Sequence, residues 1–530
     1  MTRLPSRAAA AIALAAAACL SLSVASRAEP VPASDLAPGQ TPGIPVPPAR
    51  IDAAVDRLDG LAEEILARSG IPGLAVAVVR DGQTVYAKGF GLRETGKPGQ
   101  VDADTVFQLA SLSKPVGATV VATQVGAGRI AWETPVVAHL PWFALSDPWV
   151  TDHVTVGDLY AHRSGLPDHA GDDLEDLGFD RRTVLERLRL LPLAPFRASY
   201  AYTNFGLTAA ASAVAAAAGA DWAALSEEAV YRPLGMSRTS SRFSDFAARE
   251  NRAIGHVRQG DGFAALLTRQ PDAQSPAGGV SSSAADMGRW MAMVLQDGSV
   301  DGAEVVPAKP LLAAVTPKAI SKQADSDDVR PSLYGYGFGV GVEPSGRVVL
   351  SHSGAFAMGA STALLLIPSL DLGIVVLTNA LPTGAAEALS QEFADLAQYG
   401  GITRDWYAGY ARVMAPLSAP AGSLAGASAP AEPAPALDPA DYAGAYENPY
   451  FGPLEIDVRD GALVMSVGPI PMRFPLRHWD GNRFVFVPAG ENAPAGSLSA
   501  VDFAQDDAGR IAAVTVEVFD RAGQGRFVRP

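Results

Sequence analysis

FQLASLSKP, residues 107–115, carries a Ser-x-x-Lys pair at the head of a long apolar run. A serine hydroxyl is a weak nucleophile at its own pKa, so it needs a nearby base and surroundings that keep that base neutral. Residues three apart on a helix share a face, which places Lys114 beside Ser111. If Ser111 opens a helix, its backbone N–H also points toward a developing oxyanion. The stretch therefore predicts a nucleophile, its base and part of an oxyanion hole.

An isolated Ser-x-x-Lys also fits a helix cap followed by a solvated lysine. Of the six lysines in the chain, Lys114 alone has a serine three positions before it. The pair is rare in this sequence, and the catalytic reading depends on partners elsewhere in the chain.

Composition excludes several classes of protein. With 530 residues, 48% of them hydrophobic, the chain can bury one large core and a second, smaller one. A formal net charge of -15 gives no support for binding nucleic acid or an anionic membrane. The expected partner is a small-molecule or peptide substrate.

The first residues predict an exported protein. Residues 1–28 read as a signal peptide with a charged start, an apolar run over 8–24 and a Ser-Arg-Ala end. We expect a periplasmic or secreted protein, and lipid attachment at Cys19 is the alternative that this leader leaves open. No later segment is long enough to span a bilayer. Cys19 is also the sole cysteine, so the mature chain would hold no disulfide and no thiol nucleophile.

The order of elements predicts an α+β domain over residues 50–410, after a flexible proline-rich arm at 29–49. A helix is expected at 51–69, a hairpin at 74–90, helices through 132–287, four strands within 336–378, and a last helix at 384–397. Because strands lie at both ends and helices fill the middle, we expect one antiparallel sheet flanked by helices, with a helical subdomain.

Composition changes after this domain. Residues 411–439 form an Ala/Pro-rich linker. Residues 440–530 show short alternating runs separated by turns such as Asp460-Gly461 and Asp480-Gly481. This pattern predicts a small all-β, barrel-like domain.

Two further motifs supply candidate partners for Ser111. Tyr202-Thr203-Asn204 offers a phenol that can relay a proton and an amide that can both donate and accept. The same Tyr-x-Asn pattern at 446–448 is most simply a turn.

His352-Ser353-Gly354 ends a predicted strand, where the Ala355 N–H could face the oxyanion and Gly354 would allow close approach of a substrate. His352 could share a proton with Tyr202 or meet a substrate carboxylate. His169-Ala170-Gly171 has the same pattern but is expected in a polar loop, and His162 is expected to cap a helix.

The three motifs together, in this order, resemble those of the penicillin-recognising serine hydrolases. The similarity is strongest to the group of class C β-lactamases, DD-carboxypeptidases, D-aminopeptidases and related esterases (peptidase S12-type). It covers roughly residues 51–397 and implies the β-lactamase/transpeptidase-like fold. The tail from Asp441 resembles the lipocalin-like domain that follows some of these enzymes.

The resemblance implies that Ser111 is acylated, Lys114 activates it, and Tyr202 passes protons to the leaving group. Asn204 would bind the substrate amide, and the N–H groups of Ser111 and Ala355 would form the oxyanion hole. By the same resemblance, His352 would be a further catalytic residue, and Ser353 and Gly354 would bind the substrate.

Where many β-lactamases have lysine in the third motif, this chain has His352, which carries a charge only part of the time near neutral pH. The motif then looks more like that of the D-peptide-cleaving members. The leading hypothesis is an amidase acting on peptides with D-residues. A carboxylesterase, a β-lactamase, and a non-catalytic penicillin-binding-type recognition protein are the alternatives. No metal-ligand spacing is apparent, so we expect no metal and no cofactor. The C-terminal domain is a candidate surface for homo-oligomer formation.

Overall fold

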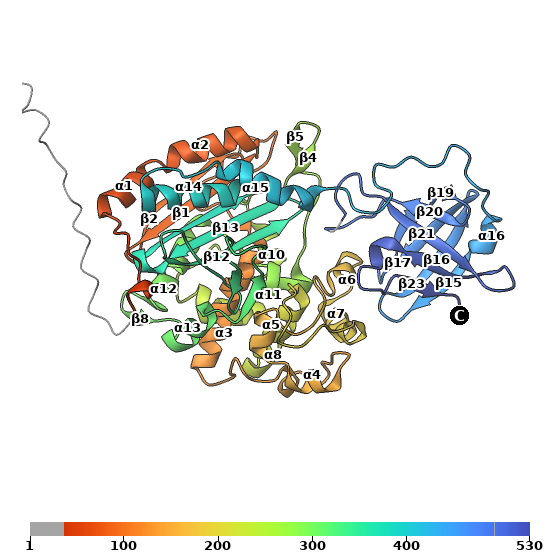
Figure 1. Cartoon of the computed structure of the whole chain (residues 1–530), viewed down its shortest axis with the longest axis horizontal. Coiled ribbons are helices and arrows are strands. Elements are labelled where there is room, and N and C mark those ends of the chain that lie inside the picture. The colour runs from red at the N-terminus through yellow and green to blue at the C-terminus, as the bar shows by residue number, and fades with distance from the viewer. Residues whose placement is uncertain (1–36, 492) are drawn as a thin grey trace, which may run out of the picture. The chain divides into compact units, whose positions relative to one another are not determined.

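The computed structural model describes residues 37–491 and 493–530 (Figure 1). The predicted signal peptide, Cys19 and the first part of the proline-rich arm lie outside the described residues. By contacts the chain divides into residues 1–45 and 46–530. The two large sheets lie in the second unit. Among the described residues, no helix combines the length and apolar character needed to cross a bilayer.

An eight-stranded sheet forms the centre of the first domain, in the order β2-β1-β14-β13-β12-β11-β10-β9. Each pair of neighbours is antiparallel. The strands are β1 (Gly73–Arg80), β2 (Gln83–Gly91), β9 (Ala319–Lys322), β10 (Ser332–Tyr334), β11 (Gly339–Val342), β12 (Val348–Phe356), β13 (Ala360–Ile367) and β14 (Leu372–Thr378).

The sheet joins the two ends of the domain, as the sequence predicts. The turn between β1 and β2 takes positive φ at Asp81 and Gly82, which suits the Asp-Gly pair. Strand β1 then pairs with β14, and Leu74 lies opposite Thr378. The predicted α+β sheet assembled from distant segments is therefore confirmed.

Apolar residues of both alternating sets on the central strands are buried, because helices cover both faces. Val76 and Val78 pack in one core with α1 (Pro48–Asp56), α2 (Leu58–Ser69) and α14 (Ala385–Tyr399). The helix expected at 51–69 is thus two helices. They are separated at Arg57, whose N–H bonds to the Ala54 carbonyl, three residues back, rather than continuing the α-helical pattern.

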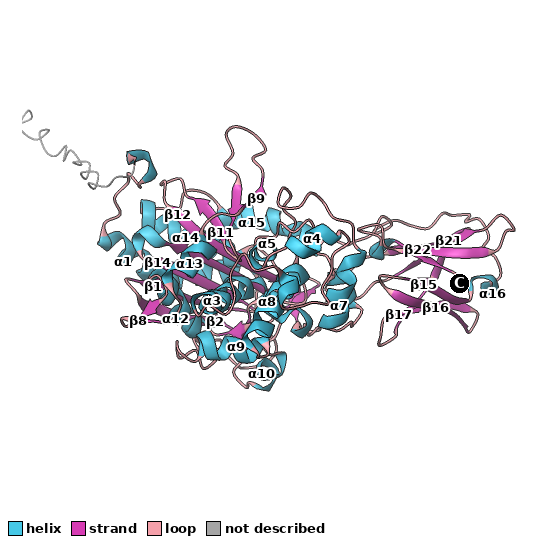
Figure 2. Ribbon diagram, turned by 90° about the horizontal axis from the view of Figure 1, so that it is seen from below, coloured by secondary structure: helices cyan, strands magenta, loops and turns pink. Residues whose placement is uncertain are grey.

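The other face carries α3 (Ser113–Gly126), α12 (Ala284–Leu295) and the helical region, where Ala75 and Ala77 join a second core. Figure 2 shows the strands of the sheet among helices on either side. The remaining helices before residue 320 are α4 (Pro148–His153), α5 (Val156–Tyr160), α6 (Asp172–Asp176), α7 (Arg181–Arg187), α8 (Asn204–Ala218), α9 (Trp222–Ser226), α10 (Phe243–Ala248), α11 (Ser275–Gly278) and α13 (Ala308–Val315).

Short two-stranded pairs complete the helical region. They are β3 (Phe107–Gln108) with β6 (Ser281–Ser282), β4 (Val257–Gln259) with β5 (Gly262–Ala264), and β7 (Ser299–Val300) with β8 (Ala303–Glu304). The β3–β6 pair matters for the site, because β3 leads directly into the Ser-x-x-Lys stretch.

The C-terminal domain is a nine-stranded antiparallel, barrel-like sheet in the order β18-β17-β16-β15-β23-β22-β21-β20-β19. Its aromatic core includes Tyr442, Tyr446 and Phe503, which lie in ring contact. The strands are β15 (Gly444–Asn448), β16 (Gly452–Arg459), β17 (Ala462–Val467), β18 (Met472–Pro475), β19 (Arg477–Asp480), β20 (Arg483–Phe486), β21 (Ser499–Gln505), β22 (Ile511–Val516) and β23 (Arg526–Val528).

The residues expected as a linker make specific contacts. After α15 (Trp406–Met414), the chain runs to α16 (Pro439–Tyr442). On the way the Ala421 N–H bonds to the Ser497 hydroxyl, and the Ala434 N–H bonds to the Asp480 carboxylate. The segment is held along the C-terminal domain at several points.

Candidate active site

Ser111 lies in a single 3₁₀ turn, Ala110–Leu112, and α3 begins two residues later. The preceding Ala110 has a φ of 48°, an uncommon value for a residue with a Cβ. The Ser113 hydroxyl donates to the Ala110 carbonyl at 2.6 Å, and Ala110 packs with Phe356 and Ala360. These contacts hold the strained turn that presents Ser111.

Lys114 is fully buried, and its amine meets three oxygen atoms. Its Nζ lies 3.0 Å from Ser111 Oγ, 2.7 Å from Asn204 Oδ1 and 3.0 Å from the Ala277 carbonyl oxygen. Burial lowers the pKa of Lys114 to about 7, although the charge of Asp172 acts in the opposite direction. A large share of the amine is therefore neutral near pH 7, as a general base requires.

Tyr202 approaches Ser111 from the loop before α8, and its hydroxyl donates to Ser111 Oγ at 2.8 Å. Burial raises the pKa of the phenol well above its usual value. Lys114 Nζ lies 4.4 Å from the centre of the Tyr202 ring. Ser111 Oγ is thus within hydrogen-bond distance of both an amine and a phenol.

His162, expected only as a helix cap, supports the Tyr202 loop instead. Its ring centre lies 4.6 Å from that of Tyr202, and its Nδ1 accepts from the Thr203 N–H at 3.2 Å. Burial lowers the pKa of His162 well below its ordinary value, so the ring is a neutral acceptor.

Asn204 is fixed by a residue that sequence reasoning missed. Its Nδ2 donates to Asp172 Oδ2 at 2.8 Å, which leaves its Oδ1 to accept from Lys114. His169 Nδ1 lies 2.7 Å from the same carboxylate oxygen, and the His169 backbone N–H donates to the Tyr202 carbonyl at 2.7 Å. His169 is therefore not a remote loop residue, and its i, i+3 spacing to Asp172 was the available signal.

Strand β12 lies against the turn that carries Ser111. Its pairing with β11 ends at Ser351, while its pairing with β13 continues to Phe356. A Cβ on Gly354 would lie 2.3 Å from the Leu109 carbonyl oxygen and 3.0 Å from Ser111 N. The glycine is therefore needed for close approach to the nucleophile's turn. The expected strand end at 352–354 lies inside the longer β12.

His352 has a different partner from those expected. Its Nε2 is 2.8 Å from the Tyr334 hydroxyl, and its ring centre is 6.4 Å from that of Tyr202. Burial lowers the pKa of His352 to about 3, so the ring is neutral near pH 7. The neighbouring Ser353 hydroxyl interacts with the Glu387 carboxyl.

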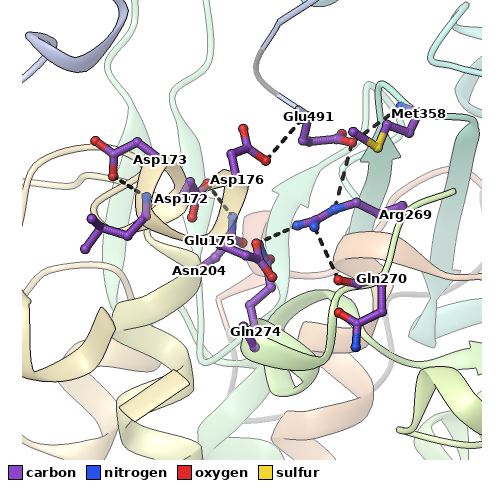
Figure 3. Close-up of polar contacts among 12 residues, drawn as sticks. Asp172, Asp173, Glu175, Asp176, Asn204, Arg269, Gln270, Gln274, Met358 and Glu491 are labelled. Atoms are coloured by element: carbon purple, nitrogen blue, oxygen red, sulfur yellow. Dashed lines mark hydrogen bonds and ion pairs between the residues drawn. The ribbon is translucent and has the colours of Figure 1, made fainter. Parts of the chain in front are cut away.

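A cavity of about 490 Å³ opens beside Ser111. Tyr202, Asn204 and the strand residues Ser353 and Ala355 line one part of it. Other walls come from outside the three motifs, and they include Asp172, Glu175, Asp176, Arg269, Pro416, Leu417 and Glu491. Figure 3 shows how the polar members of this second set lie relative to one another. Within 37–491 and 493–530, no group of three or more His, Cys, Asp or Glu side chains is placed to hold a metal ion.

Comparison with protein families and known structures gives consistent results. The model described as "Beta-lactamase" matches residues 58–398, and a "Domain of unknown function (DUF3471)" matches residues 428–526. A penicillin-binding protein homologue from Pyrococcus abyssi, solved as an octamer, superposes with a TM-score of 0.57 at 17% identity, over 90% of this chain and 100% of that one. At this identity the likeness concerns the fold.

Three curated relatives are similar over much of their length. "Unguisins hydrolase ungD'" of Aspergillus campestris is 27% identical over 60% of this chain, which spans about 60% of the length of that relative. "Penicillin-binding protein 4" of Amycolatopsis lactamdurans is 28% identical over 74% of this chain and 96% of its own. "D-alanyl-D-alanine-carboxypeptidase/endopeptidase AmpH" of Escherichia coli is 25% identical, over 65% and 88% respectively.

Proposed function

This chain belongs to the beta-lactamase family, and from that premise we propose that it is an exported serine hydrolase that cleaves amide bonds through an acyl-enzyme on Ser111. The observation that carries the proposal is the double contact of Ser111 Oγ, 3.0 Å from Lys114 Nζ and 2.8 Å from the Tyr202 hydroxyl. A pure recognition protein has no need of a buried amine whose pKa is lowered to about 7 beside a serine.

In the proposed acylation, neutral Lys114 takes the proton of the Ser111 hydroxyl as Oγ attacks the substrate carbonyl carbon. The N–H groups of Ser111 and Ala355 stabilise the negative oxygen. Tyr202 gives its proton to the leaving nitrogen and recovers one from the Lys114 ammonium, so the C–N bond breaks and the ester remains on Ser111. Water then attacks the ester, with the same groups moving protons in reverse.

Asn204 is proposed to serve both base and substrate. The Asn204 Oδ1 accepts a hydrogen bond from Lys114, and one N–H of Nδ2 donates to Asp172. The Asn204 side chain also lines the cavity, so its second Nδ2 hydrogen is available to a substrate carbonyl.

Peptides that contain D-residues are the proposed substrate class. The name of the AmpH relative refers to a D-alanyl-D-alanine carboxypeptidase and endopeptidase. In addition, the neutral His352 offers no fixed positive charge for the carboxylate of a β-lactam. Both points favour D-peptide amides over β-lactams.

Export is proposed because residues 1–28 read as a signal peptide. Assembly through the C-terminal domain is proposed because the Pyrococcus abyssi homologue is named as octameric. Intact mass of the protein recovered from the periplasm or medium should correspond to cleavage after Ala28. Light scattering of the full mature chain and of a chain ending at residue 415, just after α15, should differ in oligomeric mass if assembly uses that domain.

The decisive experiment for the mechanism is mass spectrometry after treatment with a fluorophosphonate. We expect one adduct, on Ser111, and none in Ser111→Ala. Hydrolysis is then measured on matched D- and L-aminoacyl amides, D-Ala-D-Ala peptides, short esters and nitrocefin. An adduct on another residue, or full turnover in Ser111→Ala, would end the proposal. Faster cleavage of esters than of D-residue amides would replace amidase with esterase.

A further inference from the structure

A loop of the C-terminal domain reaches the cavity beside Ser111, and Glu491 is its acidic member. Glu491 lies between β20 and β21 and is within the cavity wall. The three motifs of the hydrolase domain do not account for it. Figure 3 shows Glu491 between Asp176 on one side and Arg269 and Met358 on the other.

The Glu491 carboxylate accepts backbone hydrogen bonds from the hydrolase domain. One oxygen accepts from the Ala357 N–H, and the other lies 3.4 Å from the Met358 N. These residues follow Phe356, the last residue of β12, and lie two and three positions after Ala355. Glu491 thus holds the turn that follows β12, just beyond the proposed oxyanion donor.

The loop itself is fixed on the hydrolase domain. The Glu491 N–H donates to Asp176 Oδ1 at 3.1 Å. Gly490 has a φ of 118°, and a Cβ there would lie 2.7 Å from Asp176 Cγ. No other residue type suits this approach without strain, because the backbone conformation and the contact both favour glycine.

Arg269 links Glu491 to Glu175, another residue that lines the cavity. Its Nη2 donates to Glu175 Oε2 at 2.5 Å, and its Nε lies 3.9 Å from Glu491 Oε2. The guanidinium carbon also lies 5.2 Å from the centre of the Phe356 ring. Glu491, Arg269 and Glu175 therefore form a continuous polar chain around the end of β12.

We propose that Glu491 is a positioning residue of the hydrolase, which fixes the Ala355 N–H by holding the backbone at Ala357 and Met358. The C-terminal domain is then part of the catalytic unit and not an independent module. This inference rests on the proposed function, since Ala355 serves as an oxyanion donor only in that mechanism. Burial raises the pKa of Glu491 to about 8, while Arg269 acts in the opposite direction. Near pH 7 a neutral carboxyl, like a glutamine amide, still offers an oxygen to the Ala357 N–H.

The test compares Glu491→Ala, Glu491→Gln and the exposed control Glu455→Gln in the full chain. Glu491→Ala should lower kcat by about tenfold or more with a smaller change in KM, because a misplaced oxyanion donor weakens transition-state binding selectively. Glu491→Gln should restore most of kcat, and Glu455→Gln should match the wild type. Melting temperature is measured for each variant, and kcat is compared where all are folded.

Wild-type kcat in Glu491→Ala would overturn the inference, as would a change confined to KM or equal damage in the Ala and Gln variants. Failure of the proposed function looks different. In that case the wild type itself would show no fluorophosphonate adduct on Ser111 and no hydrolysis, whatever stands at position 491.

Discussion

On the lysine side of Ser111 the side-chain hydrogen bonds of Lys114 and Asn204 stay within the hydrolase domain, whereas on the β12 side the contacts extend into a second domain. Lys114, Asn204 and Asp172 form a buried hydrogen-bonded chain behind the serine. On the other side, the end of β12 meets Glu491 of the C-terminal domain. The difference separates two tasks, since proton transfer needs a dry and rigid setting while a substrate needs an open edge.

The largest effect is expected from Ser111→Ala, with Ser113→Ala as its matched partner in the same stretch. Ser111→Ala should abolish turnover and labelling while the melting temperature stays near that of the wild type. Ser113 instead holds the turn, through bonds with the Ala110 carbonyl and the Val280 N–H. Its removal should cost about 1–3 kcal/mol of stability but leave the adduct on Ser111. Turnover and thermal unfolding of both variants check this contrast, and loss of labelling in a folded Ser113→Ala would contradict it.

Lys114→Ala should have the next largest effect, and it tests the proposed general base directly. Removal of a general base is expected to slow acylation by about a thousandfold. In the wild type, kcat/KM should fall as pH drops through about 7, because protonated Lys114 cannot accept the serine proton. It should level off above that pH. Stopped-flow acylation and a pH profile measure both effects. A profile that stays flat from pH 5 to 8 would exclude Lys114 as the base.

Gly354→Ala tests the β12 side. The new Cβ would lie 2.3 Å from both the Leu109 carbonyl oxygen and Thr362 Oγ1, so strand and turn must separate. We expect about 1–3 kcal/mol of destabilisation and a fall in kcat of about tenfold or more. Gly341→Ala on β11 is the control, since its Cβ would meet only Val349 Cγ2, at 3.3 Å. Denaturant unfolding and kcat are the measurements, and equal behaviour of the two variants would refute the close-approach argument.

Asp172→Asn should have the smallest effect, and it tests how the charge of Asp172 acts on Lys114. The carboxylate raises the pKa of Lys114, so its loss should lower that pKa further. The acid limb of kcat/KM should then move to lower pH by about one unit, with a modest loss on the plateau. The exposed Asp152→Asn serves as control. A limb that moves to higher pH would show that Asp172 does not act on Lys114 through its charge.

The sequence predicts the central strands of the sheet, because these are apolar runs bounded by Asp-Gly and proline turns, whereas the short strands β9 and β10 were not predicted. Strands β1 and β2 around Asp81-Gly82, and β13 and β14, lie close to their expected bounds. The break at Arg57 was not predicted, because apolar spacing continues across it. Apolar periodicity indicates which residues are buried, and it does not indicate which carbonyl accepts the hydrogen bond of each backbone N–H.

The three motifs predict residues that the structure brings together at one site, because each carries a reactive group on a recognisable local pattern. Neither Asp172 nor Glu491 belongs to such a motif, and the local signal for Asp172 is limited to its i, i+3 spacing from His169. Asp172 is one of several acids in the run Asp172–Asp176, and only the fold selects the one that meets Asn204. Glu491 meets Ala357 across 134 positions of the chain. Partners that depend on long-range packing leave no mark on local sequence.

The pairing of β1 with β14 has a consequence for how the molecule is made. Leu74 lies opposite Thr378, so the free edge of the β1–β2 hairpin is covered only after most of the chain has been synthesised. Contacts so distant in sequence are associated with slow folding, and an uncovered edge invites pairing with another chain. Synthesis and folding of this protein therefore overlap in time, and a chaperone that shields the first hairpin should raise the yield of native protein.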